Sequence, residues 1–288
     1  MQVITGPTAV GKTEWALAWA ERHDAEILSC DSLLFYRGMD IGTAKPTAEE
    51  RTRVPHHLID IRSLREPMDV AEYVRLARTA AEEIAARGRR ILVVGGSGFY
   101  LKAFFAPIAD DVRVPEEIRR EVAGLVLKEA LERLRSLNPA GLGTLDVANP
   151  RRVARALERC LASGRTLAEL SRQFASQPSA FADWKVSLLR LERPREELER
   201  RIEERVGRML SAGLLNEVAV LVEQGLRDNP SARRAIGYRE CLEVIDGNLA
   251  RDRLAEAVIK STRALVRKQG TWFRTQLPAH QALKPEKR

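Results

Sequence analysis

One short stretch near the N-terminus constrains the fold of this chain more than any other. It reads GPTAVGKT and matches the pattern G-x-x-x-x-G-K-[ST], in which backbone N–H groups cradle phosphates. Val3 to Thr5 before it predict a short buried strand, and Glu14 to Arg22 after it predict a helix, which argues against a chance Gly-rich turn. We therefore expect a polyphosphate or pyrophosphate group to be held by Gly6, Pro7, Thr8, Ala9, Val10, Gly11, Lys12 and Thr13.

Two side chains of this P-loop have roles of their own. The Lys12 ammonium is expected to reach phosphate oxygens, and the Thr13 hydroxyl is placed to bind Mg²⁺ as a metal cofactor. The loop alone does not say which phosphate compound binds or what is done to it.

Bulk composition is that of an ordinary globular protein. The 288 residues are 44% hydrophobic and 31% charged, a length that predicts roughly two domains. No apolar run approaches the roughly 20 residues of a membrane span, and no signal peptide precedes the first strand, so we expect a cytoplasmic protein without a membrane partner. The cysteines are far apart and predict neither disulfides nor a zinc site. Because no apolar stripe typical of a subunit interface stands out in the sequence, we expect a monomer.

The net charge of +8 is unevenly distributed along the chain. Residues 1–110 carry −1, residues 111–180 carry +3 and residues 181–288 carry +6. An arginine-rich excess of this kind suits a polyanionic partner such as RNA, although plain solubility charge is the alternative.

A second buried strand is predicted from Ala25 to Cys30, and it ends at Asp31-Ser32. In a parallel sheet the carboxyl ends of the strands carry the site, so Asp31 is expected beside the P-loop. There it is either a general base or a carboxylate that helps to hold Mg²⁺ without binding the ion directly. The alternative is that it caps the following turn.

The segment from Tyr36 to Pro46 is punctuated by glycine and predicts a loop that covers the substrate. A short third strand is predicted from Pro55 to Asp60. The helical spacing of apolar residues from Asp69 to Arg87 predicts a helix, with Asp69 as N-cap and Gly88 as its stop.

A buried strand from Ile91 to Val94 ends in Gly95-Gly96-Ser97-Gly98. Hydrolytic P-loop ATPases have an Mg²⁺-binding aspartate at this strand end, so glycine here favours a transferase over a motor. Val186 to Leu191 predicts the strand that completes the sheet. The fold class is therefore α/β, a P-loop NTPase-like parallel sheet flanked by helices, with a core domain of residues 1–110 and 181–288.

The intervening residues 111–180 predict an inserted all-helical domain. Arg151, Arg155 and Arg159 recur every four residues and share one helix face. This face is either simply solvated or contacts the phosphate backbone of RNA. The predicted helices are Pro115–Arg135, Asn149–Ser163 and Thr166–Ala175.

A long helix is predicted to begin at Pro194 and to end near Ala212, with Arg201, Arg205 and Arg208 on one face. A helix over Leu214–Gln224 follows.

The stretch Ser231–Arg239 is basic and contains Tyr238, which either stacks on bases or is packed in a turn between helices. The last helix is predicted over Asp252–Arg274, and the tail Pro285–Arg288 is expected to be frayed.

Taken together, the sequence resembles the bacterial tRNA dimethylallyltransferase family over nearly its whole length, from Ile4 to about Thr275. A P-loop alone would be weak evidence, but its combination with GMDIGTAKP is very specific. The strings that carry the resemblance, in family order, are GPTAVGKT, the Asp31-Ser32 strand end, GMDIGTAKP, PHHLID, VVGGSGFYLKA, NPRRVARALE, SGRTLAEL, AIGYRE and TRALVRKQGTWFR.

The resemblance implies that the P-loop holds the pyrophosphate of dimethylallyl diphosphate rather than ATP. It implies that the N6 of the adenosine just 3′ of the anticodon, flipped out of the tRNA anticodon stem-loop, attacks the allylic carbon as pyrophosphate leaves. The implied catalytic residues are Asp31 as general base, Ser97 as a substrate contact and Arg205 as the pyrophosphate clamp. The residues that match tRNA-contacting stretches are Asp31, Ser32, Leu33, Leu34, Ser97, Arg119, Arg151, Arg152, Val153, Ala154, Arg155, Arg234, Ala235, Ile236, Gly237, Tyr238 and Arg239.

Three features depart from the family pattern. Ser97 stands where the family usually has Thr, which keeps the hydroxyl but loses a methyl group. The residues before Asn149-Pro150 lack the sequence His-Pro-Asn-Asp-Pro that is usual in the family. No C-terminal zinc finger is present, so we expect a bacterial form. The competing interpretations are a P-loop small-molecule kinase and a non-catalytic P-loop RNA-binding switch.

Overall fold

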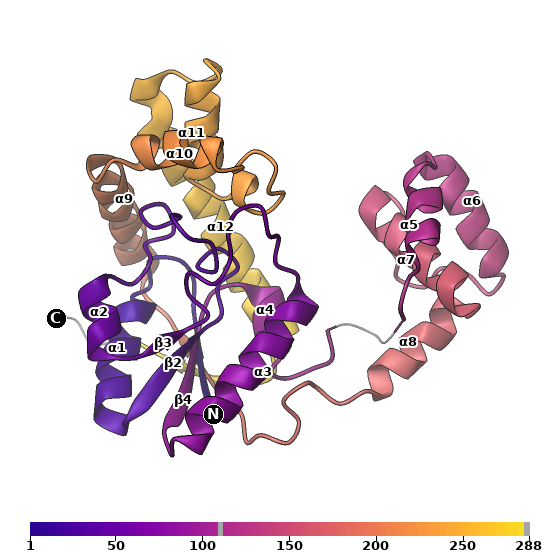
Figure 1. Cartoon of the computed structure of the whole chain (residues 1–288), viewed down its shortest axis with the longest axis horizontal. Coiled ribbons are helices and arrows are strands. Elements are labelled where there is room, and N and C mark those ends of the chain that lie inside the picture. The colour runs from indigo at the N-terminus through magenta and orange to yellow at the C-terminus, as the bar shows by residue number, and fades with distance from the viewer. Residues whose placement is uncertain (109–111, 285–288) are drawn as a thin grey trace. The chain divides into compact units, whose positions relative to one another are not determined.

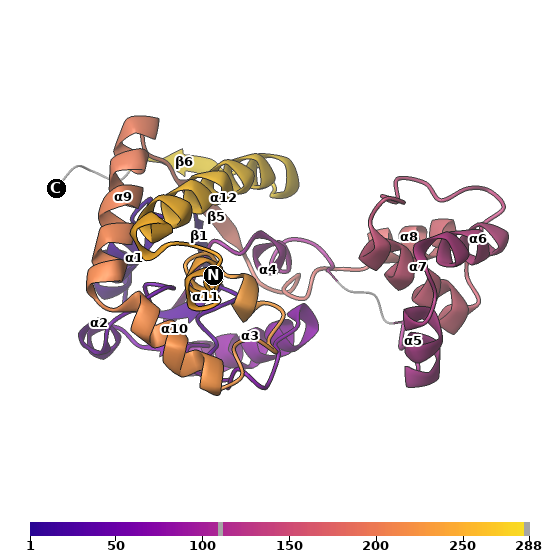
Figure 2. The same cartoon turned by 90° about the horizontal axis from the view of Figure 1, so that it is seen from above.

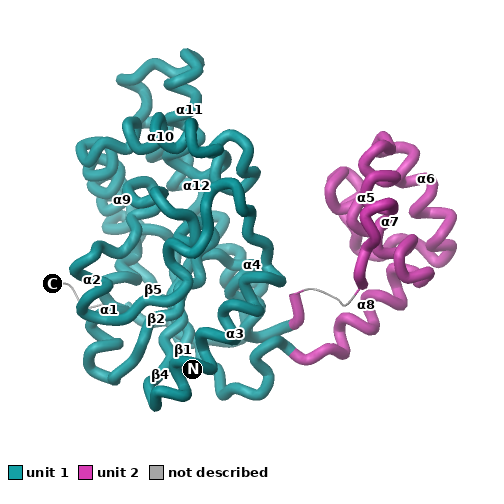
Figure 3. Tube along the Cα trace, viewed as in Figure 1, with its two compact units in different colours: residues 1–106, 179–288 teal, residues 107–178 magenta. Residues whose placement is uncertain are grey.

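The computed structural model describes residues 1–108 and 112–284, and the predicted frayed tail Pro285–Arg288 lies outside them. The chain divides into two compact units (Figure 3). The first contains residues 1–106 and 179–288, and the second contains residues 107–178, where the sequence predicted an insertion at 111–180.

The first unit is built on one six-stranded sheet in which all paired strands are parallel (Figure 1). The predicted α/β fold class is therefore confirmed. The strand order is β3-β2-β4-β1-β5-β6. The strands are β1 (Gln2–Thr5), β2 (Ala25–Ser29), β3 (His56–His57), β4 (Arg90–Val94), β5 (Ser187–Leu191) and β6 (Gln281–Leu283).

Helices cover both faces of this sheet, which is why its central strands are continuously apolar. Val3 belongs to the buried cluster on one face, together with Tyr73 of α3. Its neighbour Ile4 belongs to the cluster on the other face, together with Leu17 of α1. The helices of this unit are α1 (Lys12–His23), α2 (Ala48–Arg53), α3 (Val70–Ala86), α4 (Gly98–Lys102), α9 (Arg195–Ser211), α10 (Leu214–Glu223), α11 (Tyr238–Ile245) and α12 (Leu254–Gln276), with short 3₁₀ turns at Ala232–Arg234 and Arg251–Arg253.

Two C-terminal helices, α9 and α12, lie side by side (Figure 2). Arg201 and Arg205 of α9 and Gln269 of α12 belong to the site described below. Within the described residues, no helix combines the length and the apolar character that crossing a membrane requires.

The second unit is all-helical and has a core of its own. Val122, Leu134, Val153 and Leu157 are almost fully buried within it. Its helices are α5 (Glu116–Ala123), α6 (Leu127–Leu137), α7 (Pro150–Ser163) and α8 (Leu167–Ser176). Asn149 caps α7 by accepting a hydrogen bond from the backbone N–H of Arg152, as its position before a proline predicts.

The single helix predicted for Pro115–Arg135 is wrong, because the structure has two helices there. Gly124 ends α5, and its N–H donates to the carbonyls of Arg120 and Glu121. The Glu129 carboxylate then accepts the N–H of Val126 at 3.1 Å and starts α6. The apolar period continues across the break, so periodicity alone could not reveal it.

The third strand is also shorter than predicted. Only His56–His57 pair with β2, because Leu58 and Asp60 have φ values of 61° and 57°, which a strand cannot contain. The sequence did not predict four elements: the polar helix α2, which has no buried residue, the short helix α4 after the Gly-rich turn, the helix α11 and the edge strand β6.

Candidate active site

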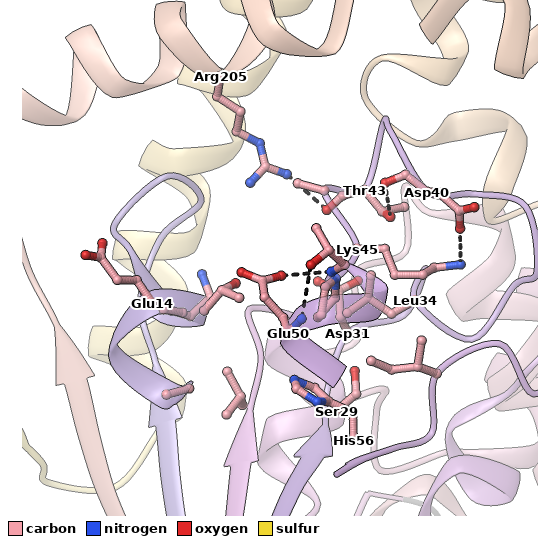
Figure 4. A pocket seen from close by; sticks show the side chains of 18 of the residues that line it. Glu14, Ser29, Asp31, Leu34, Asp40, Thr43, Lys45, Glu50, His56 and Arg205 are labelled. Atoms are coloured by element: carbon pink, nitrogen blue, oxygen red, sulfur yellow. Dashed lines mark hydrogen bonds and ion pairs between the residues drawn. The ribbon is translucent and has the colours of Figure 1, made fainter. Parts of the chain in front are cut away.

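A cavity of about 750 Å³ lies at the carboxyl ends of β1, β2 and β4 (Figure 4). Its lining comes from the P-loop, the residues after β2, the Asp40–Lys45 loop and α9. This is the position at which parallel α/β sheets bind ligands.

The P-loop follows β1 and leads into α1, as predicted. Gly11 has a φ of 97° and precedes the first residue of α1, so the N-terminus of this helix faces the cavity. A Cβ on Gly6 would lie 2.7 Å from the carbonyl oxygen of Leu191, so only glycine fits there. Of the eight residues in the motif, Thr8, Ala9, Gly11, Lys12 and Thr13 line the cavity, whereas Val10 is buried in the core.

The Lys12 ammonium is held at the base of the loop. It donates to the carbonyls of Gly6 and Pro7 at 2.8 and 3.0 Å. Burial lowers the pKa of Lys12 to about 8, while the nearby charge of Asp31 raises it and that of Arg205 lowers it. Lys12, Asp31 and Arg205 are thus close enough to influence one another's charge, and all three line the same cavity.

Asp31 follows the end of β2 after Cys30, at the edge of the sheet where the sequence predicted it. One carboxylate oxygen accepts the N–H of Leu33 at 3.0 Å. Ser97, which follows β4, accepts the N–H of Ser32 at 3.0 Å through its hydroxyl and donates to the Ser32 hydroxyl at 3.2 Å. The ends of β2 and β4 are therefore tied together beside the cavity, and Leu34 also lines it.

The glycines after β4 have a steric cause. A Cβ on Gly95 would lie 1.9 Å from the carbonyl oxygen of Cys30, so no residue with a side chain fits at this position. A Cβ on Gly96 would lie 3.6 Å from the Lys12 amine. An Mg²⁺-binding aspartate at residue 95 is thereby excluded by packing.

Arg205 reaches the cavity from α9 (Figure 4). Its Nη2 donates to the carbonyl of Thr43 at 3.1 Å. Burial lowers the pKa of Arg205, and Asp31 opposes this effect. A guanidinium nevertheless remains charged at physiological pH.

Three further residues hold the P-loop, and the sequence did not single them out for this role. Arg201 donates from Nε to the carbonyl of Ala9 at 2.8 Å, and Arg193 does the same to Val10 at 2.8 Å. Gln269 of α12 accepts the N–H of Thr8 and donates to the carbonyl of Gly96, both at 3.0 Å. The only sequence feature that indicated one of these contacts was the helix face that Arg201 shares with Arg205. Nothing near Arg193 or Gln269 in the sequence indicates that these side chains reach the P-loop.

The predicted tRNA-contacting arginines are mostly exposed. They lie on α5 and α7 of the second unit and around the start of α11 in the first. The exposed set is Arg119, Arg151, Arg152, Arg155, Arg234 and Arg239.

Four other predicted contacts are enclosed by the protein: Val153, Ala235, Gly237 and Tyr238. Val153 and Tyr238 have 0% of their surface exposed, and Ala235 has 8%. The interpretation of Tyr238 as a base-stacking ring is wrong: its ring packs against Gly42, and its hydroxyl donates to Glu217 at 2.6 Å. Val153 belongs to the core of the second unit, so its side chain cannot contact RNA.

Hard oxygen groups near the P-loop suit Mg²⁺. The Thr13 hydroxyl and the Asp31 carboxylate line the cavity, and Mg²⁺ is typically held by one or two such groups together with substrate phosphates. Over residues 1–108 and 112–284, no group of three or more His, Cys, Asp and Glu could hold a metal by itself. The cavity therefore fits a metal that arrives with a phosphate ligand.

Comparison with known proteins identifies this arrangement. A family model described as IPP transferase matches residues 34–276. The chain belongs to the IPP transferase family. The resemblance noted in the sequence is thereby confirmed, and with it the assignment to a family of prenyl-transferring enzymes.

Relatives of similar length support the family assignment. A tRNA dimethylallyltransferase of Opitutus terrae is 65% identical over 280 residues, covering 97% of this chain and 91% of the relative. One from Geobacillus kaustophilus is 39% identical and covers 96% and 88%.

Solved structures agree with the fold. A tRNA isopentenylpyrophosphate transferase of Bacillus halodurans has a TM-score of 0.70 at 34% identity, covering 98% of this chain and 89% of that one. A eukaryotic dimethylallyltransferase acting on tRNA has a TM-score of 0.86 at 24% identity, covering 99% and 73%, and at this identity shows the fold alone.

Proposed function

We propose that this enzyme transfers the dimethylallyl group of dimethylallyl diphosphate to N6 of the adenosine 3′ of the tRNA anticodon and releases pyrophosphate. The observation that carries the proposal is the meeting of Lys12, Arg205 and Asp31 in one cavity. The two cations can stabilise the negative charge of a leaving diphosphate, and the carboxylate can accept the proton of an attacking amine. Family membership supplies the tRNA and the prenyl group.

The diphosphate half of the reaction is assigned to the P-loop. As the C–O bond to the allylic carbon breaks, negative charge develops on the bridging oxygen. Lys12 and Arg205 are placed to stabilise that charge, and groups aimed at developing charge are among the largest contributors to catalysis. Mg²⁺, held at Thr13 and the phosphates, would neutralise further charge when bound.

The acceptor half is assigned to Asp31. The exocyclic amine of adenine is a poor nucleophile, because its lone pair is delocalised into the ring. When N6 forms its bond to the allylic carbon, it must lose a proton, and Asp31 accepts that proton as general base. Since N6 is unreachable in a stacked loop, the adenosine must be flipped into the cavity.

The competing functions make different use of the same cavity. A small-molecule kinase of the P-loop class usually holds Mg²⁺ through a strand-end aspartate, and the packing of Gly95 excludes one there. A non-catalytic RNA-binding switch would need no general base beside the P-loop. A monomeric state and a cytoplasmic location remain predictions.

The function is tested by incubating the protein with Mg²⁺, unmodified tRNA and dimethylallyl diphosphate labelled in the prenyl group, with ATP in a parallel reaction. We expect label to move onto tRNA and pyrophosphate to appear in equal amount. Turnover of ATP without any transfer of label would contradict the proposal.

The exposed face of α7 is assigned to the RNA backbone. Arg152 and Arg155 have ion-pair partners in Asp146 and Glu158, whereas Arg151 is exposed and has no ion-pair partner among the described residues. We expect Arg151→Ala to weaken tRNA binding and to flatten the dependence of log Kd on log salt concentration by about one unit.

The matched control for this variant is Arg135→Ala, which removes an exposed arginine from α6 of the same unit. Binding is measured by titration at several salt concentrations. We expect Arg135→Ala to leave the salt dependence of binding at the wild-type value. If Arg151→Ala also leaves it unchanged, Arg151 is a solvated residue that does not contact RNA.

A further inference from the structure

One carboxylate outside the cavity is unusually well supplied with hydrogen-bond donors. Glu217, in the first turn of α10, accepts the backbone N–H groups of Asp40 and Ile41 on one oxygen, at 3.1 and 2.7 Å. Its other oxygen accepts the N–H of Gly42 at 3.3 Å and the hydroxyl of Tyr238 at 2.6 Å. Three consecutive backbone N–H groups, of Asp40, Ile41 and Gly42, therefore donate to one carboxylate that is distant from them in the sequence.

The loop held in this way is packed as well as hydrogen-bonded. A Cβ on Gly42 would lie 2.3 Å from the ring of Tyr238, so the loop backbone lies directly on that ring. Tyr238 is completely buried. Burial raises the pKa of Tyr238 and the charge of Glu217 raises it further, which keeps the hydroxyl protonated as a donor.

The same loop forms a wall of the cavity and contacts the pyrophosphate clamp. Asp40, Ile41, Thr43 and Lys45 line the cavity. The carbonyl of Thr43 receives the Arg205 guanidinium at 3.1 Å, one residue beyond the last amide that Glu217 holds. Neither Glu217 nor Tyr238 is among the described residues that line the cavity.

We propose that Glu217 is a positioning residue for the diphosphate site: it fixes the Asp40–Gly42 backbone, which places the Thr43 carbonyl and through it the Arg205 guanidinium. The assignment of a diphosphate to this cavity rests on the proposed function. Glu217 itself touches no substrate. Its contribution is to keep Arg205 in the orientation that an anion in the cavity requires.

Glu217→Gln tests this proposal with little change in size. The new amide group replaces one acceptor oxygen with a donor. If it faces Asp40 and Ile41, both of their hydrogen bonds are lost. If it faces Gly42 and Tyr238, the Tyr238 hydroxyl can turn to accept, but the hydrogen bond from the Gly42 N–H is lost, so at least one backbone amide of the loop is released. We expect the Kd for inorganic pyrophosphate, measured by calorimetry with Mg²⁺ present, to rise about tenfold, as is common when a supporting residue is removed. This binding measurement does not depend on tRNA or on transfer, so it remains informative even if the proposed reaction fails.

The matched control is Glu223→Gln at the other end of α10. Glu223 is exposed and forms no hydrogen bond or ion pair with the described residues, so this variant should bind pyrophosphate as the wild type does. In the transfer assay, Glu217→Gln should raise KM for dimethylallyl diphosphate while KM for tRNA stays constant. A general loss of structure would change both constants.

Tyr238→Phe provides a second, milder variant in case Glu217→Gln does not fold. It removes one donor to Glu217 and keeps the ring against Gly42, and we expect a rise in pyrophosphate Kd of about threefold. The proposal is overturned if the folded variants bind pyrophosphate within the range of Glu223→Gln. It is equally overturned if both Michaelis constants rise together.

Discussion

Replacing Asp31 by asparagine is expected to lower kcat for prenyl transfer by about a thousandfold, within the range that general bases contribute. Asparagine has the same shape and can still accept the N–H of Leu33 through its oxygen, but it cannot take the proton from N6. The affinity for tRNA should change little. The measurement is single-turnover transfer of label together with a separate tRNA titration.

Glu204→Gln is the matched control for this prediction. Glu204 also lines the cavity, but it is an exposed residue of α9 and is paired with Arg200, so we expect near wild-type transfer. A large loss of tRNA affinity in Asp31→Asn, with the chemical step preserved, would make Asp31 a binding residue instead.

Replacing Lys12 by methionine is expected to lower kcat/KM for dimethylallyl diphosphate by about a hundredfold to a thousandfold at pH 7, since one preorganised charge is removed from the leaving group. The pH profile carries a second signature. In the free enzyme the pKa of Lys12 is lowered to about 8, and only its ammonium form attracts the diphosphate. As pH rises through 8, wild-type kcat/KM should therefore fall by about tenfold per pH unit.

Methionine has no group that titrates. The Lys12→Met variant should therefore have a low kcat/KM that no longer declines as the pH rises above 8. The control Lys260→Met removes an exposed lysine from α12. It should keep the wild-type kcat/KM and its decline above pH 8. The profile is measured at saturating tRNA between about pH 6 and 10. A decline above pH 8 that persists unchanged in Lys12→Met would assign the titration to another group.

Features that depend on neighbours in sequence were predictable. The P-loop could be predicted from its own glycines, its lysine and the flanking strand and helix, and the structure confirms that fold. Asp31 could be expected beside it because parallel strands present their carboxyl ends at one edge. The absence of an aspartate after β4 was visible in the sequence, although its cause, the contact of Gly95 with Cys30, was not.

Features that depend on tertiary packing could not be read from the sequence. Tyr238 lies in a basic stretch whose composition is typical of RNA binding, but the ring is buried because Gly42, distant in the sequence, presents bare backbone to it. Glu217 looks like an ordinary acidic residue on a helix surface. Only the fold brings it to the amides of Asp40, Ile41 and Gly42.

The bridge made by Gln269 has a consequence for how the protein is made. A residue near the end of the chain ties Thr8, near its beginning, to Gly96 in the middle. During synthesis, the chain must therefore emerge from the ribosome beyond Gln269 before this bridge can form. An incomplete chain that already contains the P-loop has not yet acquired this support.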